Sequence, residues 1–110
     1  MKIRVENNSD TLCVKDGGIE AVVQNDKYVF DKSEIEAVMI ITSDLGPFYD
    51  DMCLAVKIDA ETAVFIMSGH ALYEKFLFDE LGKLVNIDYQ AIIQASSCTE
   101  NKIFMLYQRD

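Results

Sequence analysis

Tryptophan is absent from this 110-residue chain, which has one proline, one histidine, three cysteines and only ten basic residues. No apolar run is longer than five residues, the length of Ala37–Ile41, whereas a transmembrane helix requires about 18 or more. The first ten residues, MKIRVENNSD, contain no apolar segment after Lys2 and Arg4, so we expect no secretory signal and a cytoplasmic protein. The scarcity of basic residues disfavours binding to nucleic acid or to an anionic membrane, because both depend on clustered Lys and Arg.

The cysteines are few and widely separated. Cys13, Cys53 and Cys98 are odd in number, and their spacing matches neither a disulfide framework nor a zinc site. We expect three reduced thiols that pack as small apolar side chains, and no cofactor. Hydrophobic residues make up 50% of the chain, which is enough for one core, so the sequence predicts a single domain over residues 1–110.

Acidic residues are in large excess, and they concentrate in the middle of the chain. The 19 Asp and Glu residues give a net charge of −9, and residues 31–61 alone hold eight acids against two bases. These acids are Asp31, Glu34, Glu36, Asp44, Asp50, Asp51, Asp59 and Glu61. Two interpretations remain open: a solvated surface that keeps the protein soluble, or a docking surface for a basic protein.

Alternating apolar residues and turn signals predict strands over most of the first 67 residues. After a short strand at Lys2–Val5, a three-stranded β-meander is expected, with strands at residues 11–15, 19–24 and 27–30 and turns at Asp16-Gly17-Gly18 and Asn25-Asp26. Ile35–Thr42 is apolar on both faces, which is typical of a central strand. A second hairpin, residues 52–58 and 62–67, is expected around Asp59-Ala60-Glu61.

The hydrophobic period changes after Ser68-Gly69. Leu72, Phe76, Leu77, Leu81 and Leu84 recur at helical spacing, so a core-facing helix is predicted from His70 to Leu84. Asp88 should cap a second helix that offers Tyr89, Ile92, Ile93 and Ser96 to one side. Residues 102–108 predict a closing strand buried on both faces, with Ile103 and Met105 in the core. The expected fold is α+β: a mostly antiparallel sheet with an N-terminal β-meander, packed against two helices and closed by a C-terminal strand.

The segment between the predicted strands, residues 43–51, contains the only proline and has no hydrophobic period, which indicates a loop. Asp44 before Leu45-Gly46-Pro47 suits an Asx-turn, with Phe48 directed to the core. The candidate partner-binding residues are Asp44, Phe48, Tyr49, Asp50, Asp51, Asp59 and Glu61.

Two catalytic or metal-binding alternatives are weaker. Asp44, Asp50 and Asp51 lack the spacing of a calcium loop, and adjacent carboxylates leaving a loop toward a strand point to opposite faces. His70 could serve as a base with Ser68, Cys53 or Cys98 as nucleophile, but the sequence around these residues contains no nucleophile motif. We therefore expect a protein that is not an enzyme and holds no metal.

The loop is also similar to a loop found in a group of known proteins. The chain resembles a loosely defined group of small acidic bacterial proteins that look like immunity proteins. The resemblance covers the stretch Thr42-Ser43-Asp44-Leu45-Gly46-Pro47-Phe48-Tyr49-Asp50-Asp51, its flanking strand, the helices and the closing segment Ile103–Arg109. Such proteins neutralise bacterial toxins by tight binding, which implies a cognate toxin as partner and no catalytic residues. A nuclease toxin fits best, because its phosphate-binding cleft is basic. The meander of residues 11–42 is also similar to bacterial pleckstrin-homology-like domains, which implies a binding domain as an alternative.

Overall fold

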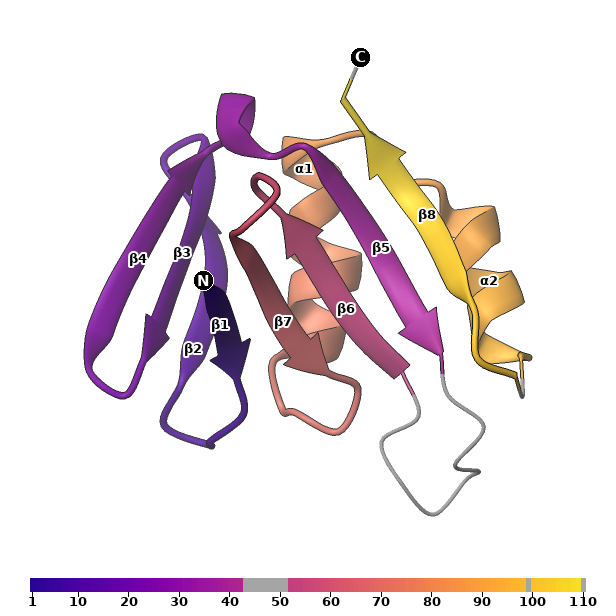
Figure 1. Ribbon diagram of the computed structural model, residues 1–110, viewed down its shortest axis with the longest axis horizontal. Coiled ribbons are helices and arrows are strands. Elements are labelled where there is room, and N and C mark those ends of the chain that lie inside the picture. Colours follow the sequence, from indigo (N-terminus) through magenta and orange to yellow (C-terminus); the bar gives the residue numbers. More distant parts are fainter. Residues whose placement is uncertain (43–51, 99, 110) are drawn as a thin grey trace.

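The computed structural model describes residues 1–42, 52–98 and 100–109. In that part of the chain the strands form two sheets, one short helical turn lies between β4 and β5, and the other helical elements lie between β7 and β8 (Figure 1). The strands are β1 Lys2–Val5, β2 Thr11–Lys15, β3 Gly18–Val23, β4 Asp26–Asp31, β5 Ala37–Thr42, β6 Met52–Lys57, β7 Ala63–Met67 and β8 Ile103–Gln108. The helical elements are η1 Lys32–Glu34, η2 Lys75–Glu80, α1 Leu81–Leu84 and α2 Tyr89–Ser96. The expected α+β fold, with mostly antiparallel strands and helices packed against them, is confirmed.

The smaller sheet is the predicted β-meander, in the order β2-β3-β4. Its first turn has positive φ angles at Asp16 (52°) and Gly17 (77°), a combination that matches the twist of a tight hairpin. Its second turn has positive φ at Gln24 (52°) and Asn25 (71°). That turn lies one residue earlier than predicted, because β4 begins at Asp26.

The larger sheet has the order β1-β7-β6-β5-β8. β5 lies between β6 and β8 and pairs antiparallel with both, as expected for a strand that is apolar on both faces. The predicted hairpin of β6 and β7 is also present. Only the β1–β7 pairing is parallel among the described strands.

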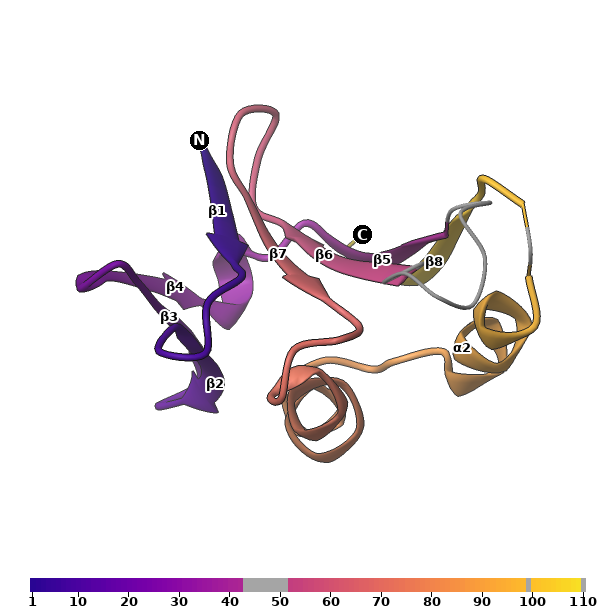
Figure 2. The ribbon, with the colours of Figure 1, turned by 90° about the horizontal axis from the view of Figure 1, so that it is seen from below.

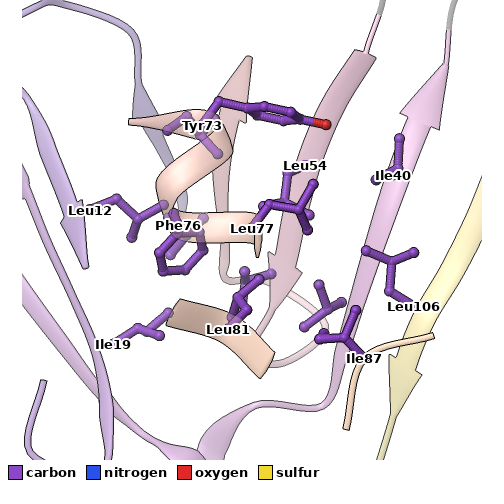
Figure 3. Packing of buried hydrophobic residues seen from close by; sticks show 14 of the residues in the cluster. Leu12, Ile19, Ile40, Leu54, Tyr73, Phe76, Leu77, Leu81, Ile87 and Leu106 are labelled. Carbon is purple, nitrogen blue, oxygen red and sulfur yellow. The ribbon is translucent and has the colours of Figure 1, made fainter. Parts of the chain in front are cut away.

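The helices cover one face of the larger sheet (Figure 2). Buried residues of both sheets and of the helices form one hydrophobic cluster, and Figure 3 shows Phe76 and Leu77 of η2 directed into it. Phe76, Leu77 and Leu81 have no exposed surface, as their helical spacing predicted. β1, β5, β6 and β7 contribute alternate residues to this cluster, so each of these strands turns its other residues to the opposite face.

The predicted core-facing helix is present, but it begins at Tyr73, three residues after the expected start near His70. Residues 73–84 are helical, and Lys75–Glu80 forms a π-helix, a form that usually appears as a single wide turn. Residues before the helix form turns in which the Nδ1 atom of His70 accepts the backbone N–H of Leu72 at 3.1 Å. The first N–H groups of a helix have no partner within the helix. The His70 side chain accepts such an N–H group, that of Leu72, just before the helix begins.

The prediction that β8 is buried on both faces is also wrong. β8 is an edge strand, and Ile103 and Met105 are 63% and 42% exposed. Leu106 faces the core instead, because neighbouring residues of a strand point to opposite faces. In α2 the Asp88 cap is confirmed by bonds from the N–H groups at positions 90 and 91, but Ile93 is 63% exposed.

Candidate functional site

Acidic residues from two separate segments gather at one end of the larger sheet, which we call the acidic end. It consists of Asp31 and Glu34 at η1 and Asp59 and Glu61 in the turn between β6 and β7, all four of them exposed. Glu34 and Asp59 line a common groove of about 460 Å³. The remaining lining is formed by Phe30, Ile58, Thr62 and Arg109.

The carboxylates of Asp31 and Asp59 each stabilise the turn in which they lie. Asp59 accepts the backbone N–H groups of Glu61 and Thr62, each at 2.8 Å, and these bonds, Glu61's first, lower the pKa of Asp59. The Ser33 hydroxyl donates to Asp31 at 2.7 Å, and this bond is the main cause of the lowered pKa of Asp31. Both groups therefore stay ionised in mildly acidic solution, and the acidic end keeps its charge.

The predicted partner-binding residues do not all have a described position. Asp44, Phe48, Tyr49, Asp50 and Asp51 lie outside the described residues, whereas Asp59 and Glu61 lie at the acidic end. The strand ends that flank residues 43–51 pair through Thr42 and Met52, at the opposite end of the β5–β6 hairpin from Ala37 and Lys57. A strand of six residues spans about 17 Å. Asp59 and Glu61 therefore lie a full strand length from the ends that flank the loop.

The sequence prediction missed an uncovered apolar surface, the open face. It is the side of the larger sheet away from the helices, and no described helix lies over it (Figure 2). Its partly or largely exposed members come from β5, β6, β7 and β8: Met39, Ile41, Cys53, Phe65, Met67, Ile103 and Met105. Three of the chain's five methionines are among them. Methionine side chains adapt to irregular partners, and they are frequent on binding surfaces.

The turn of residues 58–62 connects the two surfaces. It rises from the sheet on the side away from the helices (Figure 2), where Asp59, Glu61 and Thr62 help to line a hollow of about 250 Å³ on the open face. The same hollow is lined by the apolar side chains of Met39 and Phe65 and by the cations Lys2 and Lys57. An apolar patch with a charged margin is thus formed at the acidic end of the open face.

His70 is tied to the backbone through both ring nitrogens. Nδ1 accepts from Leu72, as described above, and Nε2 lies 2.9 Å from the carbonyl oxygen of Asn7. This arrangement requires the tautomer that carries its proton on Nε2. His70 thereby connects the entry to the helix with the loop that follows β1. A catalytic role would require the ring to exchange one of these bonds for a substrate.

The three cysteines are free and partly buried. Burial is the main cause of the raised pKa of both Cys13 and Cys53, which lowers the fraction of reactive thiolate at neutral pH. Across the described residues, no group of three or more His, Cys, Asp or Glu side chains is placed to hold a metal ion. No helix in that part of the chain is long and apolar enough to cross a membrane.

Asp10 is a buried carboxylate that the sequence did not single out. It is 1% exposed, and it accepts the backbone N–H groups of Glu6, Asn7 and Gln24 at 3.1, 2.9 and 3.1 Å. The bond from Asn7 is the largest cause of the lowered pKa of Asp10. Because residues 6 and 7 follow β1 and Gln24 belongs to the β3–β4 turn, this carboxylate joins the two sheets.

Replacing Asp10 by asparagine should lower the melting temperature at pH 7 by about 5–10 °C, because an amide group cannot accept from all three donors. The pKa of Asp10 lies below its usual value of 3.8 in the folded state. Its stabilising contribution is therefore complete above about pH 5 and is lost as the pH falls below 3.8 toward the folded pKa. Thermal melts at pH 7, 5 and 3 would show the two proteins converging at low pH. Asp26→Asn, a change at an exposed carboxylate, is the control. Parallel curves at all three pH values would contradict the role of Asp10.

Comparison with known proteins adds no relative: no family model, curated protein or solved structure matches this chain.

Proposed function

We propose that this chain is a non-enzymatic protein-binding module that docks a basic protein partner at its acidic end and on the adjoining open face. More specifically, we propose that it acts in the cytoplasm as an immunity protein, which neutralises a bacterial nuclease toxin by covering its basic cleft. The observation that carries the proposal is the turn of residues 58–62, which presents Asp59 and Glu61 beside the apolar hollow lined by Met39 and Phe65.

Charge supports the choice of partner. A nuclease cleft is basic because it binds phosphates, and a protein with a net charge of −9 mimics the charge of that substrate. Asp31 and Asp59 keep their lowered pKa through turn hydrogen bonds. A partner that approaches this end therefore meets carboxylates that are already ionised and fixed in position.

The arrangement of polar and apolar groups supports binding to a protein. Protein interfaces commonly combine an apolar centre with a polar rim. Met39, Ile41 and Phe65 supply apolar surface in the hollow on the open face, while the acidic end supplies the charged rim. The apolar part would provide affinity, and the carboxylates would speed encounter and reject acidic proteins.

The other functions suggested by the sequence remain predictions. One is a small hydrolase or metal-dependent enzyme that uses His70 or Asp44, Asp50 and Asp51, and the other is a pleckstrin-homology-like binding domain. The bonds of His70 to Asn7 and Leu72 account for that histidine as a connector between two segments, so a structural role explains its position without a substrate.

The test is charge reversal at the acidic end. We expect Glu34→Lys combined with Glu61→Lys to slow association with the toxin about tenfold at low ionic strength, with a smaller effect at high salt. These positions are chosen because Asp31 and Asp59 hold turns, whereas the Glu34 carboxylate accepts only a 3.3 Å bond from Asp31 among the described contacts. The partner to use is the product of a toxin gene adjacent to this one, and association is followed by stopped-flow fluorescence.

The matched control reverses two acids elsewhere. Glu74→Lys combined with Asp79→Lys gives the same change in net charge on the exposed side of the helix. Glu80 is left unchanged because its carboxylate accepts the N–H of Val14 at 2.7 Å. Equal slowing by both double variants would mean that only the total charge matters. No slowing by either, or a metabolic operon in place of a toxin gene, would contradict the proposal.

A further inference from the structure

A second hollow on the open face has a different character from the one at the acidic end. It has a volume of about 300 Å³ and lies beside β1. Cys53, Phe65 and Met67 form its apolar part, and Lys2, Arg4 and Glu6 supply its charged groups. Phe65 and Lys2 line both hollows, so they mark the boundary between them.

The two cations at this hollow have no carboxylate partner in the described part of the chain. By contrast, four other lysines lie within 4 Å of a glutamate: Lys15 and Lys27 at Glu20, Lys57 at Glu36, and Lys102 at Glu100. Lys2 and Arg4 are alternate residues of β1 and therefore project from the same face of the sheet. Lys2 and Arg4 thus place two cations beside the apolar side chains of the hollow, in a chain with a net charge of −9.

The strand register places the charges relative to the apolar part. Lys2 is paired with Ala63 and Arg4 with Phe65, and Met67 is paired with Cys53 on the next strand. Glu6 lies beyond Arg4 along the chain, about 13 Å from Lys2 at the rise of a strand. Lys2 and Arg4 therefore lie along the β1 side of the hollow, and its apolar residues extend toward Glu6. Lys2 also borders Asp59 and Glu61 of the neighbouring hollow.

The charge of Arg4 also acts on the apolar part of the hollow. Burial raises the pKa of the Cys53 thiol, and the positive charge of Arg4 opposes that rise. Arg4 and Cys53 line the same hollow, so Arg4 can attract a negative charge that lies over the apolar surface.

We propose that this hollow binds a carboxylate attached to an apolar chain, with the carboxylate between Lys2 and Arg4 and the chain lying across Phe65 toward Met67. Its volume is at the lower limit for small-molecule pockets, so it suits a ligand of medium chain length. A free fatty acid and the C-terminal residue of a polypeptide both carry this chemistry. The site shares Lys2 and Phe65 with the hollow at the acidic end, but its test uses octanoate and therefore requires neither the toxin nor the proposed function.

The test is an NMR titration of the ¹⁵N-labelled protein with octanoate. We expect saturable shifts of the amides of Arg4, Phe65 and Met67, with a Kd of about 0.1–1 mM for a ligand of this size. Arg4→Gln should weaken binding about tenfold, and Arg4→Lys should restore most of it. The neutral analogue 1-octanol should bind about tenfold more weakly than octanoate, because it cannot use the cations. Lys83→Gln, a change at an exposed helical lysine, should have no effect.

The absence of saturable binding at 10 mM octanoate, about ten times the weakest expected Kd, would overturn the proposal. So would shifts that map to another surface, equal affinity for 1-octanol, or no effect of Arg4→Gln. The spectrum of unliganded Arg4→Gln shows whether the fold is intact, and Arg4→Lys tests the charge in a second variant. Competition by a short apolar peptide with a free C-terminal carboxylate, but not by its amide, would assign the site to a polypeptide C-terminus. Octanoate binding without peptide competition would assign it to a free fatty acid.

Discussion

Replacing Phe76 by alanine is expected to lower the free energy of unfolding by about 3–5 kcal/mol, the usual cost of removing a buried aromatic side chain. Phe76 has no exposed surface, and Figure 3 places it close to Leu12 and Ile19 of the smaller sheet. The π-helical turn of η2 carries it into the core that both sheets share. Truncation would leave a cavity where the two sheets meet. Because the core is closely packed, neighbouring side chains could fill that cavity only if one of the sheets moved.

Urea unfolding followed by circular dichroism measures this loss. The matched control is Phe78→Ala, because Phe78 lies on the same π-helix but is 49% exposed, and its replacement should cost less than about 1 kcal/mol. If the two variants lost the same stability, Phe76 would not be the contact that joins the sheets.

Replacing Gly18 by alanine should destabilise the protein by about 1–3 kcal/mol, the cost of forcing an extra methyl group into a packed site. Gly18 is the first residue of β3 and pairs with Asp31 of β4. A Cβ atom at this position would overlap the carbonyl oxygen of Phe30 and would lie 3.0 Å from the Cα atom of Asp31. Both obstacles are backbone atoms, so β4 itself would have to move.

Gly82→Ala is the contrasting variant. Its Cβ atom would meet only the side chain of Tyr89, and Tyr89 is 45% exposed and free to turn toward solvent. Gly82 lies within α1, where alanine is the better helix former, so stability should rise by up to about 1 kcal/mol. Thermal and urea unfolding of both variants check the prediction. A Gly18→Ala protein as stable as the original would show that the β3–β4 contact yields easily.

Local sequence patterns were sufficient for most of the elements. Asp16 and Gly17 adopt the positive φ angles that a hairpin turn requires, and Asp88 caps α2 as predicted. Phe76, Leu77 and Leu81 are buried as their spacing indicated. The turn and the helix cap depend on contacts within a few residues, and the buried face of the helix follows from the spacing of its apolar residues, which is why one sequence reveals them.

The exposure of β8 depends on which elements pack against it, and its neighbour in the sheet, β5, is distant in the chain. Residues 103–107 are all apolar, so the pattern could not show which face would be covered. The position of β8 at the sheet edge and the placement of the helices on one side decided that Leu106 is buried and Met105 exposed. A strand that is apolar on both faces is compatible with either outcome until its neighbours are known.

The open face had a signal in the sequence, but a weak one. β5, β6 and β7 carry apolar residues on both faces, whereas only two helical segments were predicted to cover them. A sheet with helices on one side leaves its other side exposed. The number of covering elements therefore indicated a free apolar surface, although not its position.

By itself, the sequence determined the acidic charge, the meander, the hairpin of β6 and β7, and the helical stripe that enters the core. Only the tertiary structure placed Asp59 and Glu61 with Asp31 and Glu34 at one end, and Lys2 and Arg4 beside Phe65. The physical reason is range: turns and helices depend on neighbouring residues, whereas surface clusters arise when strand pairing joins segments that are distant in the chain.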